Sequence, residues 1–267
     1  MTTGRGTRLA LTIASLAILG FIYLPITLIF VYAFNAGTTP SWPPVGFTLH
    51  WFGEAIRNTG LQQAFITSLA VALVATVIAL VLGTLASLAV ARYRFFGRDA
   101  ISLFVIFPIA LPGIVTGMAL SSTFSLVGFP LGFLTIVIGH ATFCIVLVYN
   151  NAIARLRQTS GSFEEASADL GADSWTTFRY ITFPSLRTAL LAGALLAFAL
   201  SFDEVIVTIF TAGGVKTLPI WIFQSFRLAN QVPVVNVAGL FAILLSVIPV
   251  YIATRLTSTS GVAGSRV

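Results

Sequence analysis

Charged residues are scarce in this sequence. Asp, Glu, Lys and Arg make up 8% of the 267 residues, whereas 57% are hydrophobic and the mean hydropathy is +1.00. A water-soluble fold of this length needs more polar residues than that to cover its core. The composition therefore excludes an ordinary soluble domain and predicts an integral membrane protein.

The sequence also lacks the groups that most enzymes and metal sites use. Its one cysteine, Cys144, excludes an internal disulfide and a two-cysteine metal site. There is no HExxH, no GxSxG and no pair of separated aspartates inside the hydrophobic runs, so we expect no catalytic and no metal-binding residue. A GxxxxGK[ST] phosphate loop is missing too, so no cofactor is expected on this chain and any use of ATP needs a separate subunit.

Long hydrophobic runs are what the sequence has in place of charge. Each run is continuous and about 20 residues or longer, which is typical of a membrane-spanning helix rather than of a barrel strand. Six runs cover about residues 9–34, 61–91, 101–127, 131–154, 188–212 and 232–254. The sequence thus predicts an all-α polytopic membrane protein that forms one transmembrane domain over residues 1–267.

Basic residues are distributed unevenly around these runs. If the N-terminus, the loops after the second and fourth runs and the C-terminus share one side, that side holds all Lys and Arg except Arg57, Lys216 and Arg227. Cytoplasmic loops carry the excess of positive charge, so both termini are expected in the cytoplasm. The same asymmetry accounts for the net charge of +6, and we expect no nucleic-acid partner.

The loop over residues 155–187 is charged and carries helix signals. Ser162 precedes Glu165 by three residues, the spacing of a capping box, so a short helix is expected to begin at Ser162. The loop also holds an apolar set that would be costly to leave in water, which favours docking to another protein. This set is Phe163, Ala166, Leu170, Trp175 and Phe178.

Three residues set the expected ends of the helices in this loop. Gly171 can adopt the left-handed conformation that ends a helix, and Asp173 can cap a second helix that runs to about Phe183. Pro184 is expected to interrupt that second helix before the fifth run. The loop is therefore predicted to form two short helices joined by a sharp turn.

The spacing within this loop resembles the EAA motif of ABC importer permeases. That motif reads Glu-Ala-Ala, three residues, Gly, nine residues, Ile, one residue, Leu-Pro. Here Ser167 replaces the second Ala and Phe183 replaces the Leu. The matching residues are Glu165, Ala166, Gly171, Ile181 and Pro184.

The resemblance implies a type I importer permease fold in the bacterial inner membrane, with a coupling helix between the fourth and fifth spans. Its partners would be two copies of an ATP-binding subunit that holds ATP and Mg²⁺, a second permease subunit and an external, periplasmic binding protein. The residues that the resemblance places at the ATPase are Glu164, Glu165, Ala166, Ser167, Leu170, Gly171, Asp173, Ile181 and Pro184.

Two acids, Asp203 and Glu204, lie well inside a hydrophobic run, about 8 residues or roughly 12 Å from its outer end. An acid that faces lipid at mid-span costs on the order of 3 kcal/mol, so both should face protein or water. They can serve as an interhelical ion pair or protonated hydrogen-bonding group, or they can attract a cationic substrate. Phe202 and Phe210, at a similar depth, can offer aromatic faces to an ammonium group.

The segment SFDEVIVTIF, residues 201–210, followed by Thr217, Leu218 and Pro219, resembles the fifth-helix region of spermidine and putrescine importer permeases. The resemblance is to the member of the permease pair usually termed the C component, and it implies a polyamine substrate. A secondary transporter or channel for a cationic solute remains the alternative.

Two further features lie inside the hydrophobic runs. Pro108 and Pro112, with Gly113 and Gly117 in a GxxxG pattern, predict that the third run is a kinked helix with a face suited to close packing. His140, in the fourth run, is expected to be a hydrogen-bonded packing residue rather than a proton relay or a ligand.

Overall fold

The structure is a computed structural model that describes residues 4–262. Across this range the chain is helical, and its β pairing is limited to one isolated antiparallel bridge between Asn35 and Phe47. The chain forms two compact units, one from Met1–Gln62 with Trp221–Ile243 and the other from Gln63–Ile220 with Leu244–Val267. We refer to them as the first and the second unit.

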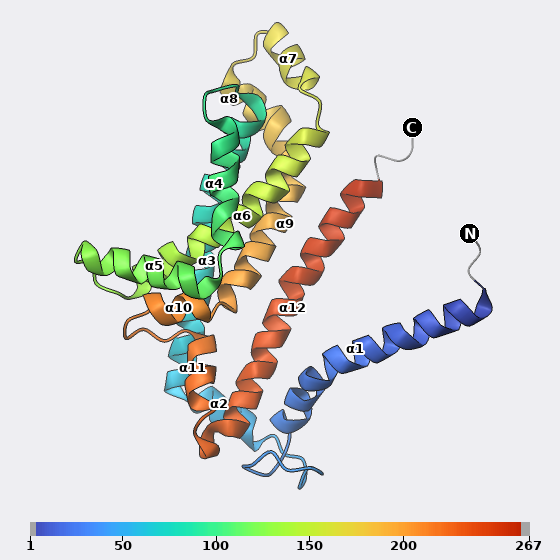
Figure 1. Cartoon of the computed structure of the whole chain (residues 1–267), viewed down its shortest axis with the longest axis vertical. Helices are drawn as coiled ribbons and strands as arrows, with labels where there is room; N and C mark the ends of the chain where they lie inside the picture. Colours follow the sequence, from blue (N-terminus) through green and yellow to red (C-terminus); the bar gives the residue numbers. More distant parts are fainter. Residues whose placement is uncertain (1–3, 263–267) are drawn as a thin grey trace. The chain divides into compact units, whose positions relative to one another are not determined.

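The helices follow one another along the chain, mostly with short connections, and a longer loop over residues 34–49 joins α1 to α2 (Figure 1). A π-helical turn, η1, and a 3-10 turn, η2, interrupt the series. The elements are α1 Arg5–Ala33, α2 His50–Arg57, α3 Thr59–Arg92, α4 Arg98–Ala110, α5 Gly113–Leu126, α6 Phe133–Gln158, α7 Ser162–Asp169, α8 Ser174–Thr177, η1 Phe178–Thr182, α9 Phe183–Phe202, α10 Ile206–Thr211, α11 Leu218–Ser225, η2 Ala229–Gln231 and α12 Val232–Val262.

Five helical stretches in the described residues are long and apolar enough to cross a membrane. They are Gly6–Ala33, Thr59–Arg92, Phe133–Gln158, Ser174–Phe202 and Val232–Arg255. The bent pair α4 and α5 gives a sixth if it counts as one span. The first, second, fourth and sixth predicted runs are therefore confirmed to within a few residues at most of their ends.

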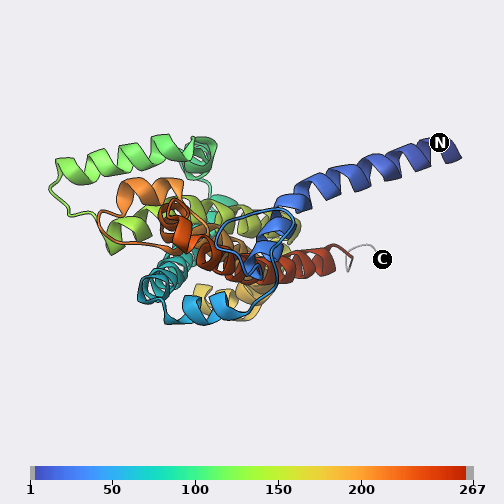
Figure 2. The same cartoon turned by 90° about the horizontal axis from the view of Figure 1, so that it is seen from below.

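The third run is not one helix, and the prediction of a mere kink was wrong in degree. Its two helices, α4 and α5, meet at an angle of 106°. The break falls at Leu111, which is extended with φ −84° and ψ 144° because the ring of Pro112 disfavours a helical conformation in the residue before it. Pro108 lies inside α4. Figure 2 shows α4 nearly end-on with α5 running across it.

The fifth run was also predicted wrongly as one helix over residues 188–212. The helix that starts at Ser174 ends at Phe202, and α10 begins only at Ile206. The Glu204 carboxylate accepts a hydrogen bond of 3.0 Å from the backbone N–H of Val207, at the start of α10. A side chain that binds a backbone N–H in this way competes with helix continuation, which accounts for the interruption.

The core of the second unit lies where α6 packs along α9. Small and aliphatic side chains fill this contact, among them Val148, Ala152, Leu186 and Ala197. Cys144 is buried there too, with its thiol 3.4 Å from the carbonyl oxygen of Ala197. In the described structure this cysteine is thus a packing residue beside the main helix pair.

The first unit is organised around the segment that follows α1. Asn35 is buried, its side chain accepts a hydrogen bond from the backbone N–H of Val45, and its carbonyl oxygen accepts one of 2.9 Å from the indole of Trp51. Phe34 packs against Phe52 on α2, with 5.0 Å between the ring centroids. These contacts give the loop between α1 and α3 a defined structure.

Candidate functional site

The helix α7 begins at Ser162, as expected, but the predicted capping box is wrong. Gly161 occupies the cap position, and no side chain caps the helix there. The backbone N–H of Ser162 donates instead to the hydroxyl of Ser160, and the N–H of Glu165 donates to the carbonyl oxygen of Gly161. The Glu165 side chain is exposed and forms no hydrogen bond or ion pair with the described residues.

The turn between α7 and α8 confirms two structural predictions. Gly171 has φ +82°, the left-handed conformation, and the N–H of Ala172 closes the helix end by donating to the carbonyl of Ser167. Asp173 caps α8, because its carboxylate accepts a 2.8 Å hydrogen bond from the N–H of Thr176. Hydrogen bonds from Thr176 hold the pKa of Asp173 below its ordinary value.

Pro184 does not interrupt the second helix, so that prediction was wrong. The helix passes from α8 through the π-helical turn η1 into α9, with Pro184 in the first turn of α9. The N–H of Phe183 bonds the carbonyl of Phe178, five residues back, and this wider turn accommodates a proline that has no N–H to offer. The loop is thereby joined to the membrane helix by continuous helical backbone.

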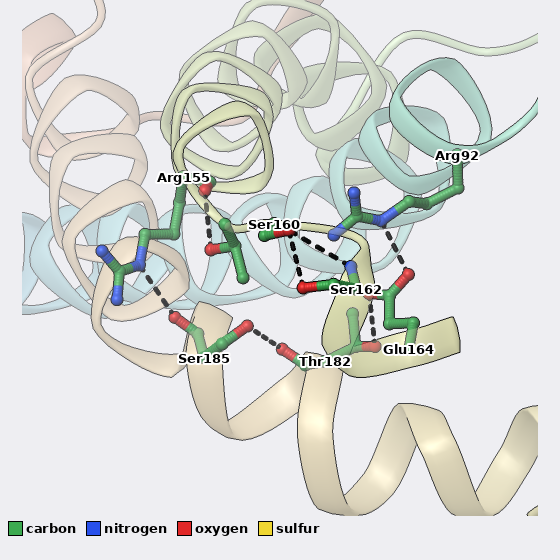
Figure 3. Close-up of polar contacts among 8 residues, drawn as sticks. Arg92, Arg155, Ser160, Ser162, Glu164, Thr182 and Ser185 are labelled. Atoms are coloured by element: carbon green, nitrogen blue, oxygen red, sulfur yellow. Dashed lines mark hydrogen bonds and ion pairs between the residues drawn. The ribbon is translucent and has the colours of Figure 1, made fainter. Parts of the chain in front are cut away.

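Glu164 links α7 to two neighbouring elements (Figure 3). One carboxylate oxygen lies 2.9 Å from Nε of Arg92 at the end of α3, and the other accepts a 2.9 Å hydrogen bond from the hydroxyl of Thr182 in η1. Close by, Nε of Arg155 on α6 donates to the carbonyl oxygen of Ser185 on α9. Glu164 therefore anchors α7 to α3 and to η1, and sequence reasoning missed Arg92 as its partner.

The remaining loop residues divide into contacts and exposed surface. The hydroxyls of Ser167 and Thr177 lie 2.9 Å apart and join α7 to α8, while Ile181 is partly buried and Ala166 and Pro184 are exposed. Large apolar side chains stand out from α7, α8 and the turn between them. Phe163 is 63% exposed, Leu170 89% and Trp175 65%.

An open groove of about 640 Å³ lies between α3, the α8–η1 segment and α9. Trp175 and Phe178 stack with 5.7 Å between their ring centroids and line its end near the loop. Leu85 and Leu190 line it farther along the membrane helices. The apolar surface of the loop thus continues onto the hydrophobic spans of the second unit.

The two acids of the fifth run have different surroundings. Asp203 follows the last residue of α9 and is exposed, and its carboxylate has no hydrogen-bond or ion-pair partner among the described residues. Glu204 is partly buried, and its carboxylate bonds the N–H of Val207 at the start of α10. Of the pair, Asp203 is the more exposed residue.

The structure packs both candidate aromatic residues against other rings or backbone. Phe202 is 1% exposed and lies 6.0 Å, between ring centroids, from both Phe65 and Phe198. Phe210 lies against Gly117 of α5, where an added Cβ would come within 2.7 Å of its ring. These contacts give each ring a packing partner, so Asp203 and not an aromatic face is the accessible group of this set.

The described residues thus define a polytopic helical membrane protein whose short α7–α8 pair continues directly into a membrane-spanning helix. Residues 79–259 match the family model described as "Binding-protein-dependent transport system inner membrane component". The chain belongs to this family, the permease subunits of ABC importers, and is a membrane transport subunit rather than an enzyme. The ATPase of such a system is a separate subunit.

Two curated relatives from Escherichia coli strain K12 are similar over most of the chain. The putrescine transport system permease protein PotI is 35% identical over 217 residues, covering 78% of this chain and 76% of the relative. The spermidine/putrescine transport system permease protein PotC is 33% identical over 251 residues, covering 93% and 94%. Both are similar in length and family to this chain.

Solved transporters share the fold. A bacterial ABC transporter involved in the import of the acidic polysaccharide alginate has a chain that matches with a TM-score of 0.70 and 18% identity. The match covers 97% of this chain and 99% of that one. At this identity the likeness establishes the importer-permease fold and says nothing of the substrate.

Proposed function

We propose that this chain forms half of the translocation path of an ATP-driven polyamine importer. A separate ATPase, present in two copies and holding ATP and Mg²⁺, docks on α7 and α8. A second permease subunit completes the path, and an external binding protein delivers putrescine or spermidine. Both termini and the α7–α8 loop lie on the cytoplasmic side, in line with the excess of Arg on that side of the spans.

The observation that supports ATPase docking is the exposed apolar surface of a loop that is otherwise well anchored. Leu170 and Trp175 would be costly to leave in water, and a protein cleft can cover them. The backbone beneath them is held by Glu164, Gly171 and Asp173. An exposed apolar surface on a firmly held backbone suits a docking contact that must transmit movement from the ATPase.

Transmission from this surface follows the covalent and polar connections of the second unit. The α8–η1 segment runs directly into α9, so a displacement of α8 by the ATPase would also move this membrane helix. The Glu164 carboxylate carries the same movement to Arg92 on α3. A nucleotide can drive transport by this route only if its two states hold the loop in different positions.

A polyamine is favoured by the exposed carboxylate of Asp203 at the break between α9 and α10. The carbonyl end of a helix carries partial negative charge, and Asp203 adds a full negative charge at that end of α9. The Glu204 carboxylate accepts a hydrogen bond from the backbone N–H of Val207 at the start of α10. The break therefore presents negative charge to a cationic solute.

Reconstitution tests the proposal directly. Proteoliposomes that contain this chain, its second permease and the ATPase should take up labelled putrescine or spermidine only with ATP and binding protein. Leu170→Asp should abolish uptake by preventing ATPase docking, whereas Leu170→Met, which stays apolar, should retain it. Uptake driven by an ion gradient through this chain alone would instead support the secondary-transporter alternative.

A further inference from the structure

We propose that His140 is a positioning residue for the substrate path. By bonding the end of α9 and the start of α10 at once, it fixes the break that keeps Asp203 outside the helices and accessible to a cationic substrate. This inference rests on the proposed cation-binding role of Asp203. It adds a residue that touches no substrate but determines where the carboxylate stands.

The imidazole of His140 bridges the two sides of the break. Its Nδ1 lies 2.7 Å from the hydroxyl of Ser201, next to last in α9, and its Nε2 lies 2.8 Å from the hydroxyl of Thr208 in α10. All three side chains are buried, with His140 1%, Ser201 2% and Thr208 0% exposed. The ring therefore spans the interruption from α6 and holds both ends from one side.

The hydrogen bonds of this network are consistent with one arrangement of protons. Thr208 donates its single hydroxyl hydrogen to the carbonyl oxygen of Glu204, at 2.8 Å. It must then accept from Nε2–H of His140, which leaves Nδ1 to accept from the hydroxyl of Ser201. Each of these polar groups then has a partner. The backbone carbonyl of Glu204, one of the three residues of the break, is connected to the His140 ring through the Thr208 hydroxyl.

The helix α10 is held at further points by α6 and by α5, so the bridge acts on a constrained element. The hydroxyl of Thr135 on α6 donates to the carbonyl of Thr211 at the end of α10, at 2.7 Å. Gly117 of α5 lies against Phe210, and α5 lies beside α10 in both views (Figures 1 and 2). With these contacts fixing α10, the His140 bridge sets how the end of α9 meets it.

A thiol-accessibility assay tests the proposal without reference to the substrate. Cys144→Ala removes the single cysteine, and Asp203→Cys then reports the break to a hydrophilic thiol reagent in the assembled transporter. Thr208→Val keeps the shape and removes the hydroxyl, and His140→Phe keeps a ring and removes both bonds. We expect Thr208→Val to slow labelling by about fivefold, the equivalent of roughly one lost hydrogen bond. His140→Phe, which loses both bonds, should slow it at least as much, and Thr208→Ser should label at the parent rate.

Transport kinetics with the native Asp203 supply the second measurement. Thr208→Val and His140→Phe should raise the polyamine concentration for half-maximal uptake by about fivefold, with basal ATP hydrolysis unchanged, and Thr208→Ser should behave as the parent. Unchanged labelling and unchanged half-saturation in correctly assembled Thr208→Val would overturn the role of His140. If the parent transports no polyamine, the proposed substrate fails, and the labelling assay still decides whether His140 positions the break.

Discussion

Nε of Arg92, the last residue of α3, lies 2.9 Å from Oε2 of Glu164 in the first turn of α7. The other oxygen of the same carboxylate accepts a hydrogen bond from Thr182, so one side chain joins the loop to α3 and to the segment that becomes α9 (Figure 3). The pair is about four-fifths buried on each side. The Glu164 carboxylate therefore ties α7 to two other helical elements of the second unit.

Removing this link should uncouple the transporter. Glu164→Leu loses both contacts, so uptake should fall sharply while ATP hydrolysis continues, and stability should drop by about 3 kcal/mol because the largely buried Arg92 charge is left without its partner. The control is Asp169→Asn, an exposed acid on the same helix. Uptake per ATP hydrolysed in proteoliposomes measures the effect, and a normal ratio for Glu164→Leu would contradict the role of the link.

The turn at Gly171 should tolerate residues according to their backbone preference. A Cβ at this position meets nothing within 4 Å, so the cost of substitution comes from φ +82° alone. Gly171→Val should cost about 1–2 kcal/mol locally and uncouple transport, with binding-protein docking intact. Gly171→Asn should remain close to the parent, because Asn adopts this conformation more readily. Equal uptake by the two variants would show that the turn conformation is not required.

The Asp173 cap should make α8 sensitive to acid. Folding lowers the pKa of Asp173, so the cap stabilises α8 fully at a pH above the unfolded pKa of about 4. This stabilisation is lost as the pH falls through the folded pKa. Asp173→Ala should reduce hydrogen-exchange protection in α8 at neutral pH, and Asp173→Asn, also a good cap, should preserve it without the acid transition. The protection factor of the Thr176 amide as a function of pH is the measurement.

The two acids at the helix break should respond differently to neutralisation. Asp203→Asn removes the accessible charge and should weaken polyamine uptake by at least about tenfold, since hydrogen bonds to charged groups contribute about 1.5–3 kcal/mol. Glu204→Gln keeps an oxygen for the N–H of Val207 and should transport nearly as the parent does. Uptake curves at matched protein levels decide the matter, and full activity of Asp203→Asn would refute cation binding there.

The contact between α5 and α10 should not accept a larger residue. At Gly117 a Cβ would lie 2.7 Å from the Phe210 ring, so Gly117→Val should destabilise the solubilised protein by about 1–3 kcal/mol. At Gly113 the nearest atom would be 3.4 Å away, and Gly113→Ala should cost less. Thermal unfolding in detergent compares the two, and Phe210→Leu should recover part of the loss at Gly117.

Hydrophobic run length was enough to predict most of the membrane helices, because a span must bury its backbone polar groups within itself and be long enough to cross the bilayer. Local chemistry likewise predicted the ends of the loop helices at Gly171 and Asp173, since a left-handed turn and an N-cap depend on one or two residues. The close-packing face of Gly113 and Gly117 was also readable from its spacing, although its partner was not.

Residues far apart in sequence decided what the pattern could not show. Arg92 and Glu164 are 72 positions apart, and His140 lies 61 and 68 positions from Ser201 and Thr208. A hydropathy run cannot reveal that Glu204 accepts a hydrogen bond from the first turn of a new helix, because α10 is placed by its packing against α5 and α6. For the same reason the sequence could not assign separate roles to Asp203 and Glu204.

The sequence by itself thus determined a helical membrane protein with a charged, helical loop, because composition and short-range spacing act on the chain locally. The tertiary structure alone decided which acid anchors the loop, how far the third run bends at its prolines, where the fifth run breaks and which carboxylate stays accessible. Those outcomes depend on hydrogen bonds and close packing between separate helices, and such contacts exist only once the chain has folded.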